Sequence, residues 1–157
     1  MQALSSRRIF WWLWSALFLL KSLMAARLPL FGDEAWYALE GRHLDLAYSD
    51  LPALTAWLAR IGVELGGPSA LGLRWPFLLL GMAVPLVLQR CARRVGDGRD
   101  AWAAATLSLA LPLLAAQGLL AVPDVALTLA AALCLLALLR LAQGERAAVL
   151  LGIGLVI

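Results

Sequence analysis

The chain has 157 residues, of which 63% are hydrophobic and 15% are charged, and its mean hydropathy is +0.86. Soluble domains average roughly 45–50% apolar and about 25% charged residues, so this composition excludes an ordinary soluble domain and indicates an integral membrane protein. The net charge of +3 does not indicate a nucleic-acid partner, because the arginines cluster at the ends of apolar segments, where the positive-inside rule places them in cytoplasmic loops.

The first apolar segment, at about residues 9–31, follows Arg7 and Arg8 and is long enough to cross a ~30 Å hydrocarbon core. The positive-inside rule then predicts a cytoplasmic N-terminus. The small residues at 24–26 also resemble a signal-peptide cleavage site, but the apolar segments that follow favour an uncleaved first helix. Lys21 lies within this segment and is expected to face the interior of a helical bundle.

Residues 32–68 are too polar to cross a membrane and are expected to form an outer loop. Within this loop, large apolar residues recur at helical spacing on one face, which predicts a helix at about 53–65 lying in the plane of the membrane interface. These residues are Leu54, Trp57, Leu58, Ile61 and Leu65.

Further membrane spans are predicted at about 69–89, 101–121 with a kink at Pro112, and 125–139. A fifth apolar stretch, 147–157, is too short to cross, so we expect the chain to stop in mid-helix. The arginine-rich connections then lie inside, and the loop 32–68 and the turn at Asp124 lie outside. The expected fold is all-α: a multi-spanning transmembrane bundle of about four complete spans with interfacial helices in the first outer loop.

The candidate functional residues are polar groups predicted to lie at the outer edge of the bundle. Acids at this depth are functional candidates by default, and those at the end of the first span could instead only terminate that helix in headgroup water. An arginine there could bind a phosphate or could extend to the lipid headgroups. The candidates are Asp33, Glu34, Tyr48, Asp50, Arg74 and Asp124.

Four segments, in this order and spacing, resemble the N-terminal part of the GT-C membrane glycosyltransferases. They read Gly-Asp-Glu-Ala-Trp-Tyr at 32–37, Leu-Ala-Tyr-Ser-Asp-Leu-Pro-Ala-Leu at 46–54, Gly-Leu-Arg-Trp-Pro at 72–76 and Val-Pro-Asp at 122–124. The most similar branch is that of the dolichyl-phosphate-mannose protein mannosyltransferases and the bacterial lipid A aminoarabinose transferases. The second segment departs from the family pattern, because Leu51 stands where the family often has histidine. Family members also have many more membrane helices.

This resemblance implies transfer of a sugar from a polyprenyl-phosphate carrier to a lipid, glycan or protein acceptor on the outer face of the membrane, with inversion. Asp33 would be the general base, while Glu34 and Asp124 would orient the acceptor or Asp33 itself. Arg74 would bind the leaving phosphate, and Tyr48 and Asp50 would also contact the substrate. The expected location is a bacterial inner membrane.

No cofactor is expected, although the need for a divalent ion stays open. His43 is the only histidine and has no partners at ligand spacing, so no metal site is predicted. Two other functions stay open: a small multi-spanning transporter or scaffold subunit whose outer acids bind a cation or partner, and an inactive truncated homologue. A transporter would carry polar groups near the membrane midplane in several helices.

Overall fold

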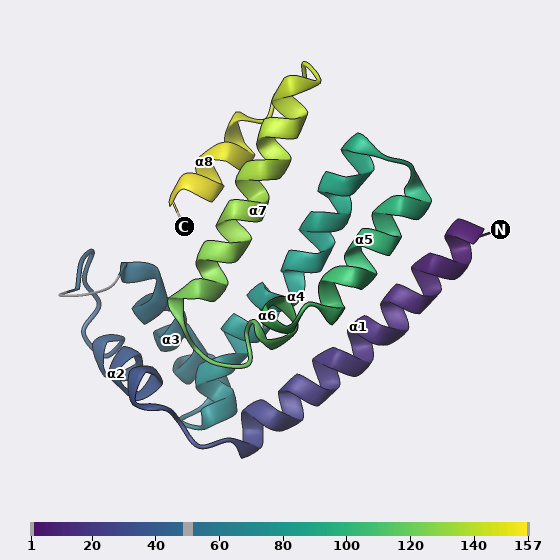
Figure 1. The fold of residues 1–157 in the computed structure, drawn as a ribbon. Helices are drawn as coiled ribbons and strands as arrows, with labels where there is room; N and C mark the ends of the chain where they lie inside the picture. The colour runs from purple at the N-terminus through teal and green to yellow at the C-terminus, as the bar shows by residue number, and fades with distance from the viewer. Residues whose placement is uncertain (1, 49–51, 157) are drawn as a thin grey trace.

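The computed structural model describes residues 2–48 and 52–156, which form helices and contain no β-strand (Figure 1). The prediction of an all-α fold is therefore confirmed for this part of the chain. The helices are α1 (Gln2–Arg27), α2 (Gly32–Glu40), α3 (Ala53–Gly66), α4 (Ala70–Val95), α5 (Gly98–Ala110), α6 (Pro112–Ala116), α7 (Pro123–Ala142) and α8 (Ala148–Val156).

Helix α4 lies at the centre of the bundle and packs against α1, α3, α5 and α7. Figure 1 shows α1 and α5 on one side of it and α7 with α8 on the other. The buried residues of α4 include Leu73, Phe77 and Met82. Because lipid is as apolar as these side chains, close packing and polar contacts, rather than removal from water, hold such helices together.

Charged residues are distributed unequally between the two ends of the bundle. The start of α1 and the ends of α4 and α7 lie in the upper part of Figure 1, and most of the arginines lie at or near these ends, whereas Arg27 and Arg74 lie at the opposite one. The opposite end holds α2, α3 and the starts of α4 and α7. This sorting agrees with the predicted alternation of the loops, and a cytoplasmic location of the arginine end stays a prediction.

Among the described residues, three helices are long and apolar enough to cross a membrane: Ser6–Arg27, Ala70–Val95 and Pro123–Ala142. Their residues overlap the spans predicted near 9–31, 69–89 and 125–139, and their crossing of a membrane stays a prediction. The third predicted span, 101–121, needs correction because it is not one kinked helix. It consists of α5, the five-residue α6 and a non-helical segment up to Val122.

Pro112 causes the break. A proline disfavours helical geometry in the residue before it, and Leu111 is extended, with φ −70° and ψ 123°. Helix α5 therefore ends at Ala110, and Pro112 starts α6 at a position where its missing N–H is not needed. The sequence prediction treated this proline as a bend, whereas it terminates the helix.

Two glycines let the interrupted segment lie directly against α4. A Cβ atom at Gly81 would be 2.5 Å from the carbonyl oxygen of Gln117. Gly118 has φ +80°, which favours glycine, and a Cβ there would collide with the carbonyl oxygen of Phe77. The backbones of α4 and of the segment after α6 are therefore in contact.

Helix α3 begins where the sequence predicts it and packs on α4 through small residues, which include Ala56, Ala59 and Gly62. Its large apolar side chains Trp57 and Ile61 are exposed. Leu58, on the same predicted face, instead packs against the buried cluster that contains Leu73 and Phe77. The predicted apolar face is therefore only partly turned away from the bundle, and its contact with a lipid interface stays a prediction.

We predict that Gly81→Ala destabilises the protein by about 1–3 kcal/mol, because the added methyl group forces two packed backbones apart. Thermal unfolding in detergent, followed by circular dichroism, measures the change. Gly152→Ala is the control, because a Cβ at this helical glycine meets nothing within 4 Å. The explanation of the close approach is wrong if both variants unfold at the wild-type temperature.

Candidate active site

At the end of the bundle that holds α2 and α3, named the outer-loop end after the predicted topology, lies an ion pair between Glu34 and Arg74, both fully buried. Glu34 lies in the first turn of α2 and Arg74 in the first two turns of α4. The Arg74 Nε atom donates to Oε1 at 2.8 Å, and its Nη2 atom donates to Oε2 at 2.6 Å. This is the two-point geometry that makes an arginine–carboxylate pair strong and directional.

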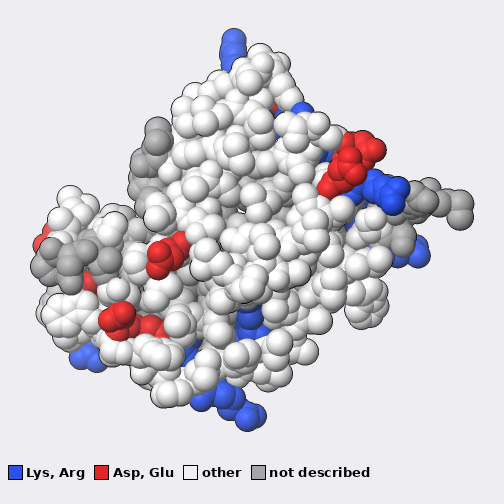
Figure 2. All heavy atoms as spheres, viewed as in Figure 1, with Lys and Arg blue, Asp and Glu red and all other residues white. Residues whose placement is uncertain are grey.

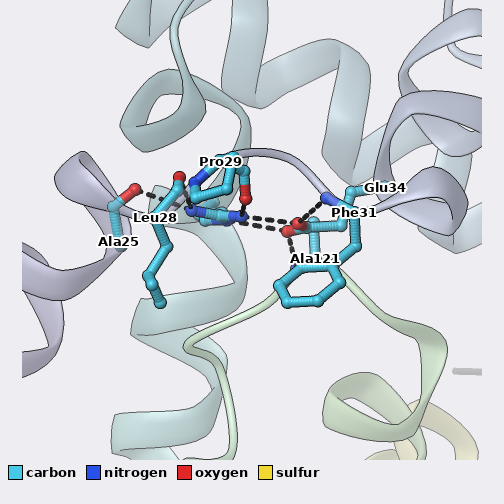
Figure 3. A network of polar contacts seen from close by, with 7 residues as sticks. Ala25, Leu28, Pro29, Phe31, Glu34 and Ala121 are labelled. Atoms are coloured by element: carbon cyan, nitrogen blue, oxygen red, sulfur yellow. Dashed lines mark hydrogen bonds and ion pairs between the residues drawn. The ribbon is translucent and has the colours of Figure 1, made fainter.

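The remaining N–H groups of Arg74 bind the end of α1 and the residues after it (Figure 3). Its Nη1 atom donates to the carbonyl oxygens of Ala25 at 2.8 Å and Leu28 at 2.9 Å, and Nη2 donates to that of Pro29 at 2.8 Å. The last carbonyls of a helix have no partner within the helix, so the guanidinium caps α1. All five N–H groups of Arg74 are thereby used.

The hydrogen-bonding positions of the Glu34 carboxylate are also all occupied. Besides Arg74, its Oε1 atom accepts from the backbone N–H of Ala121 at 2.8 Å, and Oε2 accepts from that of Phe31 at 3.1 Å. Burial alone would raise the pKa of Glu34, but the hydrogen bonds from Arg74, Ala121 and Phe31 outweigh it and hold the pKa below its ordinary value. Glu34 is therefore a carboxylate.

The ion pair joins four parts of the chain: the end of α1, the start of α2, the start of α4 and the segment before α7. Figure 3 shows the carboxylate reaching both the Phe31 turn and Ala121. Neither Glu34 nor Arg74 keeps a free polar atom for a substrate. In this structure the two residues fix the positions of their neighbours in the sequence.

Asp33, the neighbour of Glu34, is exposed in the first turn of α2. Asp124 is exposed in the first turn of α7, three residues after the Ala121 N–H that Glu34 binds. The structure thus brings both acids to the outer-loop end, although no hydrogen bond joins them within residues 2–48 and 52–156. In Figure 2, acidic atoms face the viewer at this end beside a broad uncharged surface.

Asp124 borders a cavity of about 280 Å³ between α6 and the start of α7. Gln117 and Thr128 line the same cavity, and the Gln117 Nε2 atom donates to the Thr128 hydroxyl at 2.8 Å. The cavity is open enough to admit part of a ligand beside an exposed carboxylate. The sequence analysis did not identify this grouping, because the two residues lie on separate segments that only the fold brings together.

Tyr48 organises the first outer loop. Its hydroxyl donates to the carbonyl oxygen of His43 at 2.8 Å and accepts from the backbone N–H of Asp45 at 3.0 Å. Trp57 on α3 donates to the carbonyl oxygen of Asp45 at 2.9 Å, which ties this loop to α3. Asp50 lies outside the described residues.

Lys21 is buried in α1, as predicted, and its Nζ atom donates to the carbonyl oxygen of Gln117 at 2.6 Å. The ammonium group thus binds a carbonyl that the broken helix leaves free. The sequence does signal a polar contact here, because Lys21 is a charge near the middle of an apolar span, but no sequence pattern identifies the Gln117 carbonyl as its partner. Among the described residues, no group of three or more His, Cys, Asp or Glu side chains could hold a metal ion.

Fold and site together define a multi-spanning helical membrane protein with carboxylates at one end. A family model described as dolichyl-phosphate-mannose-protein mannosyltransferase matches residues 50–157. The chain is also 36% identical over 127 residues to the lipid A galacturonosyltransferase RgtD of Rhizobium johnstonii, a stretch that covers 80% of this chain and 27% of that protein. No solved structure matches.

The chain therefore belongs to the dolichyl-phosphate-mannose-protein mannosyltransferase family, which confirms the resemblance to GT-C glycosyltransferases found in the motifs. It spans about a quarter of the length of the curated relative. The matched region contains Arg74 and Asp124, whereas Asp33 and Glu34 precede the part that the family model matches.

We predict that Glu34→Gln destabilises the protein by about 3–5 kcal/mol at neutral pH, because it leaves the Arg74 charge buried without a counter-ion. The folded-state pKa of Glu34 lies below the ordinary 4.5, so its contribution is present above that pH and is lost as the pH falls through the folded-state value. The difference in Tm between wild type and variant, measured in detergent, should therefore narrow below about pH 4.5.

Arg74→Lys supplies the matched control for charge. Lysine keeps the positive charge but has three N–H donors and no planar fork, so part of the network is lost. We expect a Tm between those of wild type and Glu34→Gln. A wild-type Tm for both variants at neutral pH would show that the ion pair does not hold this end together.

Proposed function

We propose that the protein is a membrane glycosyltransferase that moves a sugar from a polyprenyl-phosphate carrier to an acceptor hydroxyl on the outer face of the membrane. Family membership supports the reaction class. The observation that carries the assignment of the site is the saturated Glu34–Arg74 ion pair, which leaves the adjacent Asp33 exposed at the outer-loop end.

Asp33 is the general base in this proposal. Its carboxylate takes the proton of the acceptor hydroxyl while the hydroxyl oxygen attacks the anomeric carbon of the donor sugar. The bond from that carbon to the phosphate oxygen breaks, and the polyprenyl phosphate leaves with the electron pair. A single displacement inverts the anomeric configuration and requires no nucleophilic side chain.

The other predicted site residues take different parts. Asp124 orients the acceptor from the cavity at the start of α7. Glu34 and Arg74 position Asp33 and Asp124 rather than touching the reacting groups, because their hydrogen-bonding atoms are already engaged. Tyr48 and Asp50 stay proposed substrate contacts in the first outer loop.

The relative's name concerns a lipid A acceptor and a galacturonosyl group. We propose by analogy that the acceptor of the present protein is a membrane-anchored glycolipid. A glycolipid keeps its hydroxyl groups at the height of the membrane surface, where α2, α3 and the start of α7 meet.

A transporter stays the second candidate, because one structural feature favours it. Lys21, Gln117 and Thr128 form a polar connection from α1 through an interrupted helix to α7, and interrupted helices with polar contacts form ion sites in many transporters. Family membership favours the transferase.

We predict that Asp33→Asn, in the protein expressed from its own complete gene, lowers sugar transfer at least about 100-fold, because an amide cannot accept the proton. Transfer of labelled sugar from a polyprenyl-phosphate donor to membrane glycolipid measures the loss. Glu64→Gln is the control, since Glu64 is an exposed acid of the same outer segment that pairs with Arg60 on α3. Unchanged transfer by a normally inserted Asp33→Asn protein would refute the proposal for Asp33.

A further inference from the structure

The arginine end of the bundle contains a pocket that the proposed reaction does not use. It has a volume of about 590 Å³ and lies between the last turns of α4 and the second half of α7. It is lined by four arginines, two glutamines and Leu136. The arginines are Arg90, Arg93, Arg94 and Arg140.

The charges in and around this pocket are not balanced by protein groups. Glu145 forms ion pairs with Arg94 and Arg140, the latter at 2.9 Å, and these hold the pKa of Glu145 below its ordinary value. Arg90 and Arg93 are exposed and have no ion pair among the described residues. Four guanidinium groups therefore face one carboxylate.

A buried donor in the same pocket points to an anionic ligand independently of the arginines. Gln89 is only 7% exposed, and its Nε2 atom has no hydrogen-bond partner. Buried N–H groups in folded proteins are nearly always paired, so an unpaired one in a pocket wall calls for an acceptor from outside the chain. The unpaired N–H donors here, on Arg90, Arg93 and the Gln89 amide, suit phosphate oxygens.

Hydrogen bonds between α4 and the residue after α7 also hold part of the pocket wall in place. The Gln143 Nε2 atom donates to the carbonyl oxygen of Arg94 at 2.8 Å, and its Oε1 atom accepts from the Arg94 side chain at 3.0 Å. These bonds join the end of α7 to the end of α4. Arg94 is thereby held in the wall, while Arg90 and Arg93 stay available to a ligand.

The position of the pocket indicates the source of the phosphate. Its walls are the ends of two helices long and apolar enough to cross a membrane. The side chain of Leu136 borders the pocket and belongs to an apolar cluster with Val87 and Leu129. A ligand with phosphate at the arginines and acyl chains in the surrounding hydrocarbon is a phospholipid. Anionic lipids of the cytoplasmic leaflet bind basic pockets between membrane helices.

We propose that this pocket, with Arg90, Arg93 and Gln89 as its free donors, binds the headgroup of an anionic phospholipid, preferably one with two phosphates. The two unpaired arginines and the buried amide can serve two phosphate groups at once. This site does not depend on the glycosyltransferase reaction, so its test and the test of Asp33 are separate.

The experiment is a titration of the purified protein, in a neutral detergent, with tetraoleoyl cardiolipin and with dioleoyl phosphatidylcholine, counting bound lipids by native mass spectrometry. We expect one cardiolipin molecule to bind to each protein molecule, with clearly higher affinity than phosphatidylcholine. Arg90→Gln combined with Arg93→Gln should weaken the affinity for cardiolipin about thirtyfold, because each arginine contributes about fivefold. Gln89→Leu should weaken it about tenfold, because a hydrogen bond to a charged group is lost.

The matched control is Arg8→Gln combined with Arg146→Gln, which removes the same charge from exposed arginines outside the pocket. It should change the affinity by less than about twofold, and circular dichroism checks that every variant folds. Equal weakening by the control would overturn the proposal, since charge alone would then explain binding. Absence of a retained cardiolipin, or displacement of it by equimolar inorganic pyrophosphate, would overturn it as well.

Discussion

The half of the bundle that contains α2 and α3 depends on one buried ion pair. Removing a charge from water costs several kcal/mol, and breaking a buried pair is strongly destabilising, so such groups persist only when all their hydrogen-bonding atoms are engaged. Glu34 and Arg74 meet this condition with seven hydrogen bonds, two between themselves and five to backbone groups. Four of the five backbone groups lie outside the helices, at Leu28, Pro29, Phe31 and Ala121, which explains how a loop-rich end keeps one arrangement.

Because all hydrogen-bonding positions of Glu34 are occupied, Glu34 and its neighbour Asp33 have different roles. Successive residues of a helix point about 100° apart, so the first turn of α2 turns Glu34 into the bundle and leaves Asp33 outside it. A saturated carboxylate suits a positioning role, whereas an exposed one can exchange protons with a substrate. Asp124 is held in place by the same pair, because Ala121 binds Glu34 just before α7 begins.

Apolar patterning in the sequence is sufficient to predict the long helices, because α1, α4 and α7 are each apolar over enough residues to cross a bilayer. It is insufficient for residues 101–121, where composition resembles a span but Pro112 interrupts the backbone. The chemistry of the motifs identifies Glu34 and Arg74 as important yet not as partners. They lie forty residues apart in sequence, and only the packing of α2 against the bundle brings them together.

The interruption after Ala110 also changes the depth at which polar backbone groups lie in the membrane. At 1.5 Å per residue, the thirteen residues of α5 extend about 20 Å, some 10 Å less than the hydrocarbon thickness. The remainder of that layer is filled by α6 and by backbone whose carbonyl groups require polar partners, one of which is Lys21. Polar backbone of this chain therefore lies within the depth that the hydrocarbon layer would occupy, next to the cavity that Gln117 and Asp124 line.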